Sequence, residues 1–129
     1  MITHLADSDW VIEYLRGRQQ GTRLLRPLIE AGSLATSIIV YAEIFDGILG
    51  DANRDQRLRS LNDFLAGVPV LGIDRETAEE FARLRSGLRT RGELLADHDT
   101  WIAATALRHD VALLARDQHF DRIAELKRT

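Results

Sequence analysis

The chain has 129 residues, a net charge of -3 and no cysteine. This length fits one domain with a single core, and the absence of thiols excludes disulfides, zinc–thiolate sites and cysteine nucleophiles. No segment approaches the roughly 18 consecutive apolar residues that a membrane span needs, and the N-terminus does not have the form of a targeting peptide. We therefore expect a cytoplasmic protein that does not bind membranes, with any metal held by oxygen or imidazole.

Strands alternate with helices along the chain. Ser37 and Asp74 are typical helix N-caps, and Gly17 and Gly32 are typical residues at helix ends. In chain order we expect a strand over 2–6, helices over 10–16, 22–31, 38–49 and 56–65, a strand over 68–73, helices over 75–89 and 100–107, a strand over 111–115 and a short helical segment over 120–126. No second strand is expected before 68–73.

This order predicts an α/β fold with a small parallel sheet flanked by helices, in three α/β/α layers, because parallel strands require crossover connections. Ligands of such folds bind beyond the carboxyl ends of the strands. Asp7 ends the first strand, Asp117 follows the last strand, and Asp99 lies in the first turn of the helix that leads into it. The topology can therefore bring these three carboxylates to one edge of the sheet.

Glu43 is a fourth acid in an unusual place. Its helical neighbours Val40, Ile44 and Gly47 are apolar or small, so its side chain is predicted to face the interior or a cleft. An unpaired carboxylate in the interior is costly. Glu43 is therefore hard to explain as an ordinary surface residue.

Four neighbouring carboxylates repel one another unless a cation compensates their charge. Magnesium or manganese suits a scattered set of acids, because these ions prefer oxygen ligands and keep several waters. Zinc is disfavoured, since no pair of histidines has ligand spacing. Such a cation can polarise a phosphoryl group and stabilise a leaving oxygen, so phosphodiester hydrolysis is the natural reaction.

Each acid also has a simpler interpretation. Asp7 and Asp99 can cap helices, and Asp117 can be a turn residue. Asp9 and Asp97 are assigned mainly to capping or solvation, with a supporting role near the metal as the alternative.

The chain resembles the PIN-domain ribonucleases, specifically the VapC toxins of type II toxin–antitoxin pairs. The resemblance runs nearly end to end, and the third of its motifs is the most specific. The matching segments are Asp7-Ser8 with Leu15-Arg16-Gly17, Ala42-Glu43 with Gly47, Asp99 to Ala106, and Leu114-Ala115-Arg116-Asp117 with Phe120.

The resemblance implies a single PIN domain over residues 1–129 with endoribonuclease activity. It makes Asp7 and Asp99 the principal Mg²⁺ ligands, with Mn²⁺ as a substitute, and Glu43 and Asp117 the supporting residues of an acidic catalytic pocket. It further implies an RNA substrate, a homodimer, an antitoxin that covers the active site, and promoter DNA bound only through that antitoxin. Two departures are Ala115, where the family more often has threonine, and a short C-terminus that abbreviates the last edge strand.

Two other functions remain open at this point. A receiver-like phosphoacceptor domain also gathers acids at strand ends, but it needs a lysine near the pocket, and the only lysine is Lys127. A non-catalytic PIN-like RNA-binding module would be expected to lack some of the acids. For RNA binding, the candidate phosphate contacts are Arg16, Arg85, Arg89 and Arg91, since arginine forks match phosphate geometry.

Overall fold

The computed structural model describes residues 1–129. Four strands and six α-helices alternate along the chain and are followed by a 3₁₀ helix. The elements are β1 His4–Ala6, α1 Ser8–Leu15, α2 Gln19–Glu30, β2 Leu34–Ser37, α3 Ile38–Leu49, α4 Arg54–Leu65, β3 Val70–Leu71, α5 Arg75–Thr90, α6 Asp97–Arg108, β4 Ala112–Leu114 and η1 Gln118–Arg122. None of the helices combines the length and the apolar character required to span a bilayer.

The sheet has the strand order β3-β2-β1-β4, and all neighbouring strands are parallel. At its centre, Leu5 of β1 pairs with Ala35 of β2 on one side and with Leu113 of β4 on the other. The chain leaves β1 toward β2 and returns later to the opposite side of β1 as β4. The connections therefore diverge at the carboxyl ends of β1 and β4, which is where doubly wound folds bind ligands.

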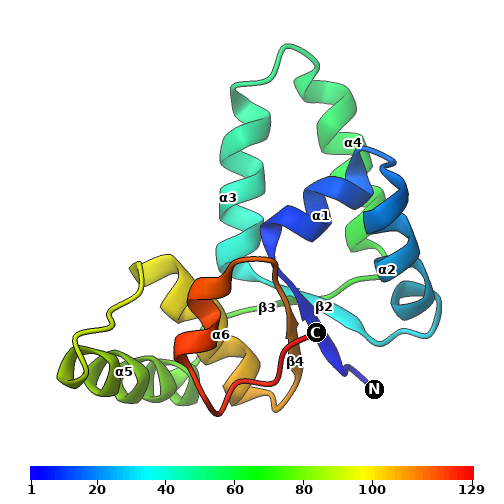
Figure 1. Cartoon of the computed structure of the whole chain (residues 1–129). Coiled ribbons are helices and arrows are strands. Elements are labelled where there is room, and N and C mark those ends of the chain that lie inside the picture. The colour runs from blue at the N-terminus through cyan, green and yellow to red at the C-terminus, as the bar shows by residue number, and fades with distance from the viewer.

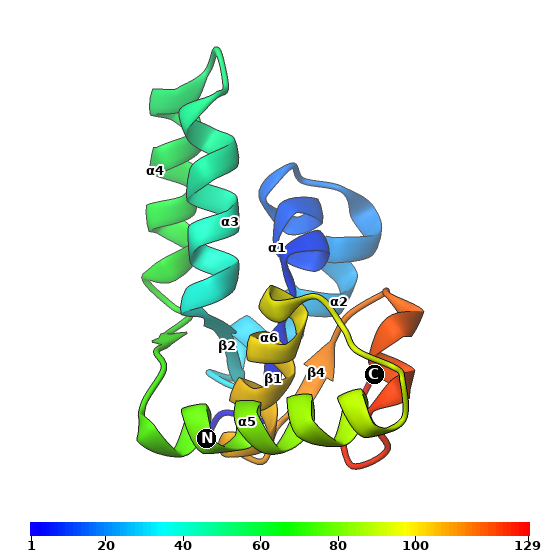
Figure 2. The same ribbon diagram turned by 90° about the vertical axis from the view of Figure 1, so that its left-hand side faces the viewer.

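Helices cover both faces of this sheet (Figure 1). α1 and α2 pack together on one face, and α5 and α6 pack together on the other. α3 and α4 form a helical hairpin that extends beyond the carboxyl ends of the strands (Figure 2). The predicted three-layer α/β/α architecture is confirmed.

The central strands are short and largely apolar in their buried parts. Leu5, Leu34, Leu113 and Leu114 have no exposed surface. Strands that are covered by helices on both faces need apolar residues at successive positions, which explains why these segments show no polar alternation.

The sequence analysis missed β2. This strand has four residues, Leu34–Ser37, and all of them are buried. Its last two residues are polar, and Thr36 satisfies its hydroxyl by donating to the Ala6 carbonyl at 2.9 Å. Ser37 ends the strand and also caps α3, because its Oγ accepts the Val40 N–H at 3.1 Å. A short run of mixed polarity that merges into a helix cap gives no recognisable strand pattern.

Several element boundaries also differ from the expectation. β3 has only two residues, and the last helical segment is a 3₁₀ helix over Gln118–Arg122. α6 begins at Asp97, so Asp99 lies inside its first turn as predicted. The final edge strand is reduced to a single bridge between Leu113 and Arg128, which agrees with the expected abbreviation.

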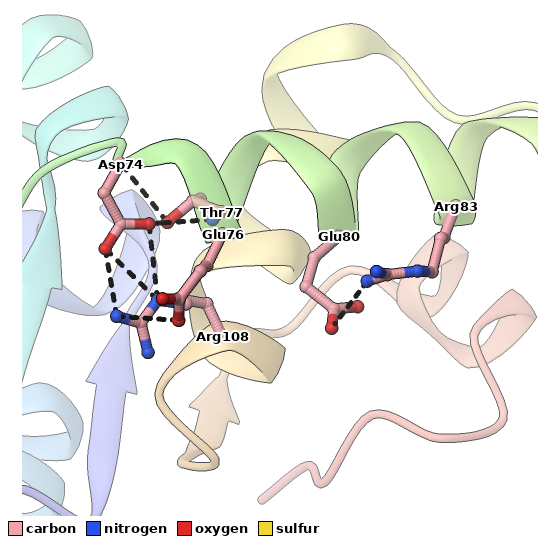
Figure 3. A network of polar contacts seen from close by, with 6 residues as sticks. All are labelled: Asp74, Glu76, Thr77, Glu80, Arg83 and Arg108. Atoms are coloured by element: carbon pink, nitrogen blue, oxygen red, sulfur yellow. Dashed lines mark hydrogen bonds and ion pairs between the residues drawn. The ribbon is translucent and has the colours of Figure 1, made fainter.

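Asp74 ties the start of α5 to the end of α6 (Figure 3). Its carboxylate accepts the Thr77 N–H and hydroxyl at 2.8 Å, and its backbone N–H donates to the Thr77 Oγ1 at 3.4 Å, which completes a capping box. The Arg108 guanidinium donates to the same carboxylate and pairs with Glu76 at 3.1 Å. The Arg108 and Thr77 donors together hold the pKa of Asp74 well below its usual range.

Glu79 and Arg83 lie one turn apart on α5, a spacing that allows an ion pair, but they do not form one. Arg83 pairs with Glu80 instead, at 3.2 Å and one turn away on the exposed side of α5 (Figure 3). Both spacings place an acid and a base on neighbouring turns of a helix, so the sequence alone does not distinguish them.

α1 and α2 approach each other closely at Gly21. A Cβ atom at this position would lie 2.5 Å from the Glu13 Cβ and 2.9 Å from the Tyr14 backbone nitrogen. We expect Gly21→Ala to lower the free energy of unfolding by about 1–3 kcal/mol, because the two helices must separate. Urea denaturation measures the effect.

Gly47→Ala is the matched control, since nothing lies within 4 Å of a Cβ on that helical glycine. This control should be neutral or stabilise by up to about 1 kcal/mol, as alanine favours a helix over glycine. Equal stabilities for the two variants would contradict the close packing of α1 on α2.

Candidate active site

The carboxyl ends of β1 and β4 carry two of the predicted acids. Asp7 directly follows β1, and its backbone N–H donates to the Leu114 carbonyl at the end of β4, at 3.0 Å. Asp117 follows β4 by three residues and begins η1. The divergence of the sheet connections therefore places both acids on the same edge.

Asp7 is the most buried carboxylate of the chain, with 7% of its surface exposed. It occupies the N-cap position of α1, yet its side chain makes no capping hydrogen bond. Its pKa is raised from 3.8 to about 6. Burial is the largest cause, the Ser8 N–H opposes it, and the negative charges of Glu43, Asp9 and Asp99 add to the increase. Capping therefore does not account for this residue.

Asp99 lies in the first turn of α6, with 18% of its side chain exposed. The N-cap of α6 is Ala96, so Asp99 does not cap the helix either. Burial and the charges of Asp117 and Asp9 raise its pKa, whereas His98 and His119 oppose this effect. His98 lies on the helix with its Nε2 3.4 Å from Asp99 Oδ1, and is not a loop residue.

Glu43 lies in the middle of α3, directly before the core residue Ile44 and one turn after the core residue Val40. Val40 and Ile44 are buried, but Glu43 itself is exposed at the edge of a cavity. Of the two predicted locations for the Glu43 side chain, the interior is wrong and the cleft is right. Partial burial raises the pKa of the Glu43 carboxyl, with smaller contributions in the same direction from Asp99 and Asp9.

Asp117 is exposed, with 44% of its side chain accessible. Its Oδ1 accepts the His119 N–H at 2.8 Å and lies 3.2 Å from His119 Nδ1. Asp117 therefore does cap η1, as its simpler interpretation predicted. Its charge nevertheless acts on Asp99, so it also belongs to the acidic group electrostatically.

The structure separates the two supporting candidates. Asp9 contributes to the raised pKa of Asp7, Glu43 and Asp99, which places it among these acids. Asp97 points elsewhere, because its Oδ1 pairs with Arg85 Nε at 3.2 Å. The sequence offered one signal for Asp9, its position two residues after Asp7 at the end of β1.

The acidic group fits a hard divalent cation. No three carboxylate or imidazole side chains converge closely enough to enclose one ion. Mg²⁺ does not require such a cage, because it keeps several waters and binds proteins through one or two carboxylates. The pKa values of Asp7, Glu43 and Asp99 are raised mainly by burial and further by the negative charges of neighbouring acids, which His98 and His119 offset only in part. A divalent ion would compensate this negative charge.

A cavity of about 130 Å³ begins beside Glu43 and runs between α1, α3 and α4. Its wall is apolar and its rim is charged. The lining residues are Ile12, Leu15, Arg16, Glu43, Ile44, Gly47, Ile48, Asp51, Arg57 and Ser60.

The four arginines predicted as phosphate contacts differ in whether an acidic side chain already pairs with them. Arg16 lies on the cavity rim and forms no ion pair, and Arg89 also has no acidic partner. Arg85 is engaged by Asp97, and Arg91 pairs with Glu93 at 3.1 Å and donates to the Arg122 carbonyl. Arg16 is therefore the candidate that lies beside the acids.

The family model of the PIN domain matches residues 5–126. The chain belongs to the PIN-domain family. A ribonuclease VapC1 from Methanocaldococcus jannaschii is 30% identical over 122 residues, which cover 94% of this chain and 81% of that protein. A ribonuclease VapC1 from Haemophilus influenzae is 25% identical over 126 residues, covering 96% and 94%.

Chains in solved toxin–antitoxin complexes have the same fold as this PIN domain. The VapBC-1 structure from nontypeable Haemophilus influenzae aligns with a TM-score of 0.80 and 25% identity over 99% of this chain and 97% of the other. VapBC2 from Rickettsia felis, bound to a DNA fragment from its promoter, gives a TM-score of 0.90 at 21% identity over 100% and 98%. The resemblance to VapC ribonucleases that the motifs indicated is confirmed.

Proposed function

We propose that this PIN domain is a divalent-metal-dependent endoribonuclease and the toxin of a type II toxin–antitoxin pair. The observation that carries the proposal is the buried carboxylate of Asp7, which makes no capping hydrogen bond and lies near the charges of three other acids. The ribonuclease names of its VapC relatives support the choice of RNA as the substrate.

In this proposal Asp7 and Asp99 hold Mg²⁺ or Mn²⁺, and Glu43 and Asp117 support the site from its edge. When bound, the cation would polarise the phosphoryl group and stabilise the leaving oxygen. Glu43 is exposed at the cavity and its raised pKa favours proton uptake, so its carboxylate is placed to accept a proton from the attacking water. Arg16 on the cavity rim would contact a phosphate of the RNA.

The antitoxin partner is proposed from the neighbouring complexes, which are VapBC pairs. The cavity beside Glu43 has apolar walls formed by α1, α3 and α4, so a protein segment that covered it would also cover Glu43. Promoter DNA would be bound through the antitoxin, because the net charge of -3 does not favour direct DNA binding. A homodimer is proposed on the family resemblance.

The receiver-like alternative is excluded by the PIN family match over residues 5–126. The only lysine is also engaged elsewhere, since Lys127 Nζ pairs with Asp110 at 2.8 Å. A non-catalytic PIN module remains the second candidate, and metal dependence distinguishes it from the enzyme.

The direct test incubates the purified chain with labelled single-stranded and structured RNA in MgCl₂, in MnCl₂ and in EDTA. We expect cleavage in either metal and none in EDTA, because the acids alone cannot neutralise charge on a phosphodiester. Expression of the chain in a bacterial host should arrest growth. RNA binding without cleavage in all three conditions would instead identify a non-catalytic module.

A further inference from the structure

Arg116, the residue before Asp117, reaches helix α1 with its side chain. Its NH2 group donates to Glu13 Oε1 at 2.8 Å and to Gln20 Oε1 at 3.3 Å. Its guanidinium carbon lies 4.1 Å from the centroid of the Trp10 ring. Arg116 thus reaches two residues of α1 and one of α2, about a hundred positions earlier in the sequence.

Glu13 and Trp10, the α1 partners of Arg116, are themselves held by other contacts. The Glu13 side chain is 13% exposed and also pairs with Arg18 at 3.7 Å. Its Cβ lies against Gly21, where α1 and α2 are in closest contact. The Trp10 ring packs on the hydrophobic core. A planar guanidinium that both stacks and forms an ion pair in this way has little freedom to move.

The other end of the same loop has a separate anchor. The Ala115 carbonyl accepts a hydrogen bond from Arg128 NH2 at 2.6 Å, and Arg128 also pairs with Asp121. The segment 115–117 is therefore attached to the C-terminal tail on one side and to α1 on the other. The side chain of Asp117 is bonded only to its neighbour His119.

We propose that Arg116 is a positioning residue, which fixes the Asp117 loop through Trp10 and Glu13 on α1, the helix whose N-cap is Asp7. This inference rests on the proposed function, because it concerns the geometry of the same acids. α1 follows β1 and η1 follows β4, and the only side chain that joins the Asp117 loop to α1 by an ion pair is Arg116. Arg116 would not touch the RNA; it would act through Asp117.

A double-mutant cycle with Asp117 tests the proposal, using MgCl₂ and a labelled single-stranded RNA in saturating excess over the protein. Arg116→Ala should lower kcat by about ten- to a hundredfold, the range for residues that orient ligands of a metal site. In the Asp117→Ala background, Arg116→Ala should lower kcat by less than about twofold, since effects through a shared residue are not additive. An equal loss in both backgrounds would show that Arg116 acts elsewhere and would overturn the proposal.

Arg83→Ala is the matched control, because Arg83 pairs only with Glu80 on the exposed side of α5. It should leave kcat unchanged. Arg116→Lys keeps the charge that Glu13 binds but loses the planar fork, so its kcat should fall between those of the wild type and Arg116→Ala. A kcat for Arg116→Lys no higher than that of Arg116→Ala would count against the ion pair with Glu13.

Hydrogen exchange measures the same positioning without RNA or metal. The amides of His119 and Phe120 bond to Asp117, and Arg116→Ala should accelerate their exchange by at least about tenfold while amides of α5 stay unchanged. Unchanged exchange at these amides would overturn the proposal. If the wild-type chain cleaved no RNA, the proposed function would fail, and this exchange experiment alone would decide whether Arg116 fixes the loop.

Discussion

Asp7→Asn and Asp99→Asn should each reduce the rate of metal-dependent RNA cleavage by about a thousandfold, equivalent to about 4 kcal/mol of lost transition-state stabilisation. Both substitutions keep the size of the side chain and remove a charge that the proposed cation requires. Neither carboxylate caps its helix through its side chain, so the fold does not depend on these charges. Single-turnover cleavage with MgCl₂ measures the rates, and circular dichroism checks the fold.

Asp97→Asn is the matched control for Asp99→Asn. Asp97 lies two residues earlier in the same turn of α6, but it is exposed and pairs with Arg85. Its loss should leave cleavage within about twofold of the wild type, as expected for an exposed ion pair. Cleavage by Asp99→Asn at the rate of Asp97→Asn would remove Asp99 from the site.

Asp7→Asn should also be more stable than the wild type in the absence of metal, by an amount that depends on pH. The folded protein holds the Asp7 proton more tightly than the unfolded chain, since burial raises the pKa from 3.8 to about 6. As pH rises through this interval, the unfolded chain ionises first and the wild type loses stability. Above pH 6 the loss from Asp7 reaches about 3 kcal/mol, at 1.36 kcal/mol for each pKa unit.

Urea denaturation of both proteins from pH 4 to pH 8, in EDTA, measures this difference. The two stabilities should converge near pH 4, where Asp7 is protonated in the folded protein, and diverge as the pH rises. Groups with lowered pKa values, such as Asp74, destabilise both proteins alike at acid pH and cancel in the comparison. Added Mg²⁺ should stabilise the wild type at pH 7 and leave Asp7→Asn unchanged. A difference that stayed constant with pH would contradict the burial of an ionisable Asp7.

The positions of Asp7 and Asp117 could be predicted from the sequence because a general rule covers them. Parallel strands align their carboxyl ends, so acids that follow two such strands meet at one edge. Asp99 followed from the same rule, because its helix precedes β4 directly. The three-layer fold required only the alternation of helices and strands, and it did not depend on finding β2.

The remaining features depend on tertiary contacts that no local pattern records. Glu43 was expected in the interior or a cleft, and only the placement of α3 against α1 and α4 shows that it borders a cavity. Asp97 and Asp9 each lie two residues from a predicted metal ligand, yet only Asp97 forms an ion pair with Arg85. The contacts of Arg116 with Trp10 and Glu13 join residues that are far apart in sequence, and nothing in either segment indicates them.

The most direct test of the metal site is the anomalous scattering of Mn²⁺ in crystals of the chain without an antitoxin. At the manganese absorption edge, we expect a peak beside the carboxylates of Asp7 and Asp99, and we expect it to disappear in crystals of Asp99→Asn. A manganese peak remote from both carboxylates, or one that persisted in Asp99→Asn, would contradict the proposed site.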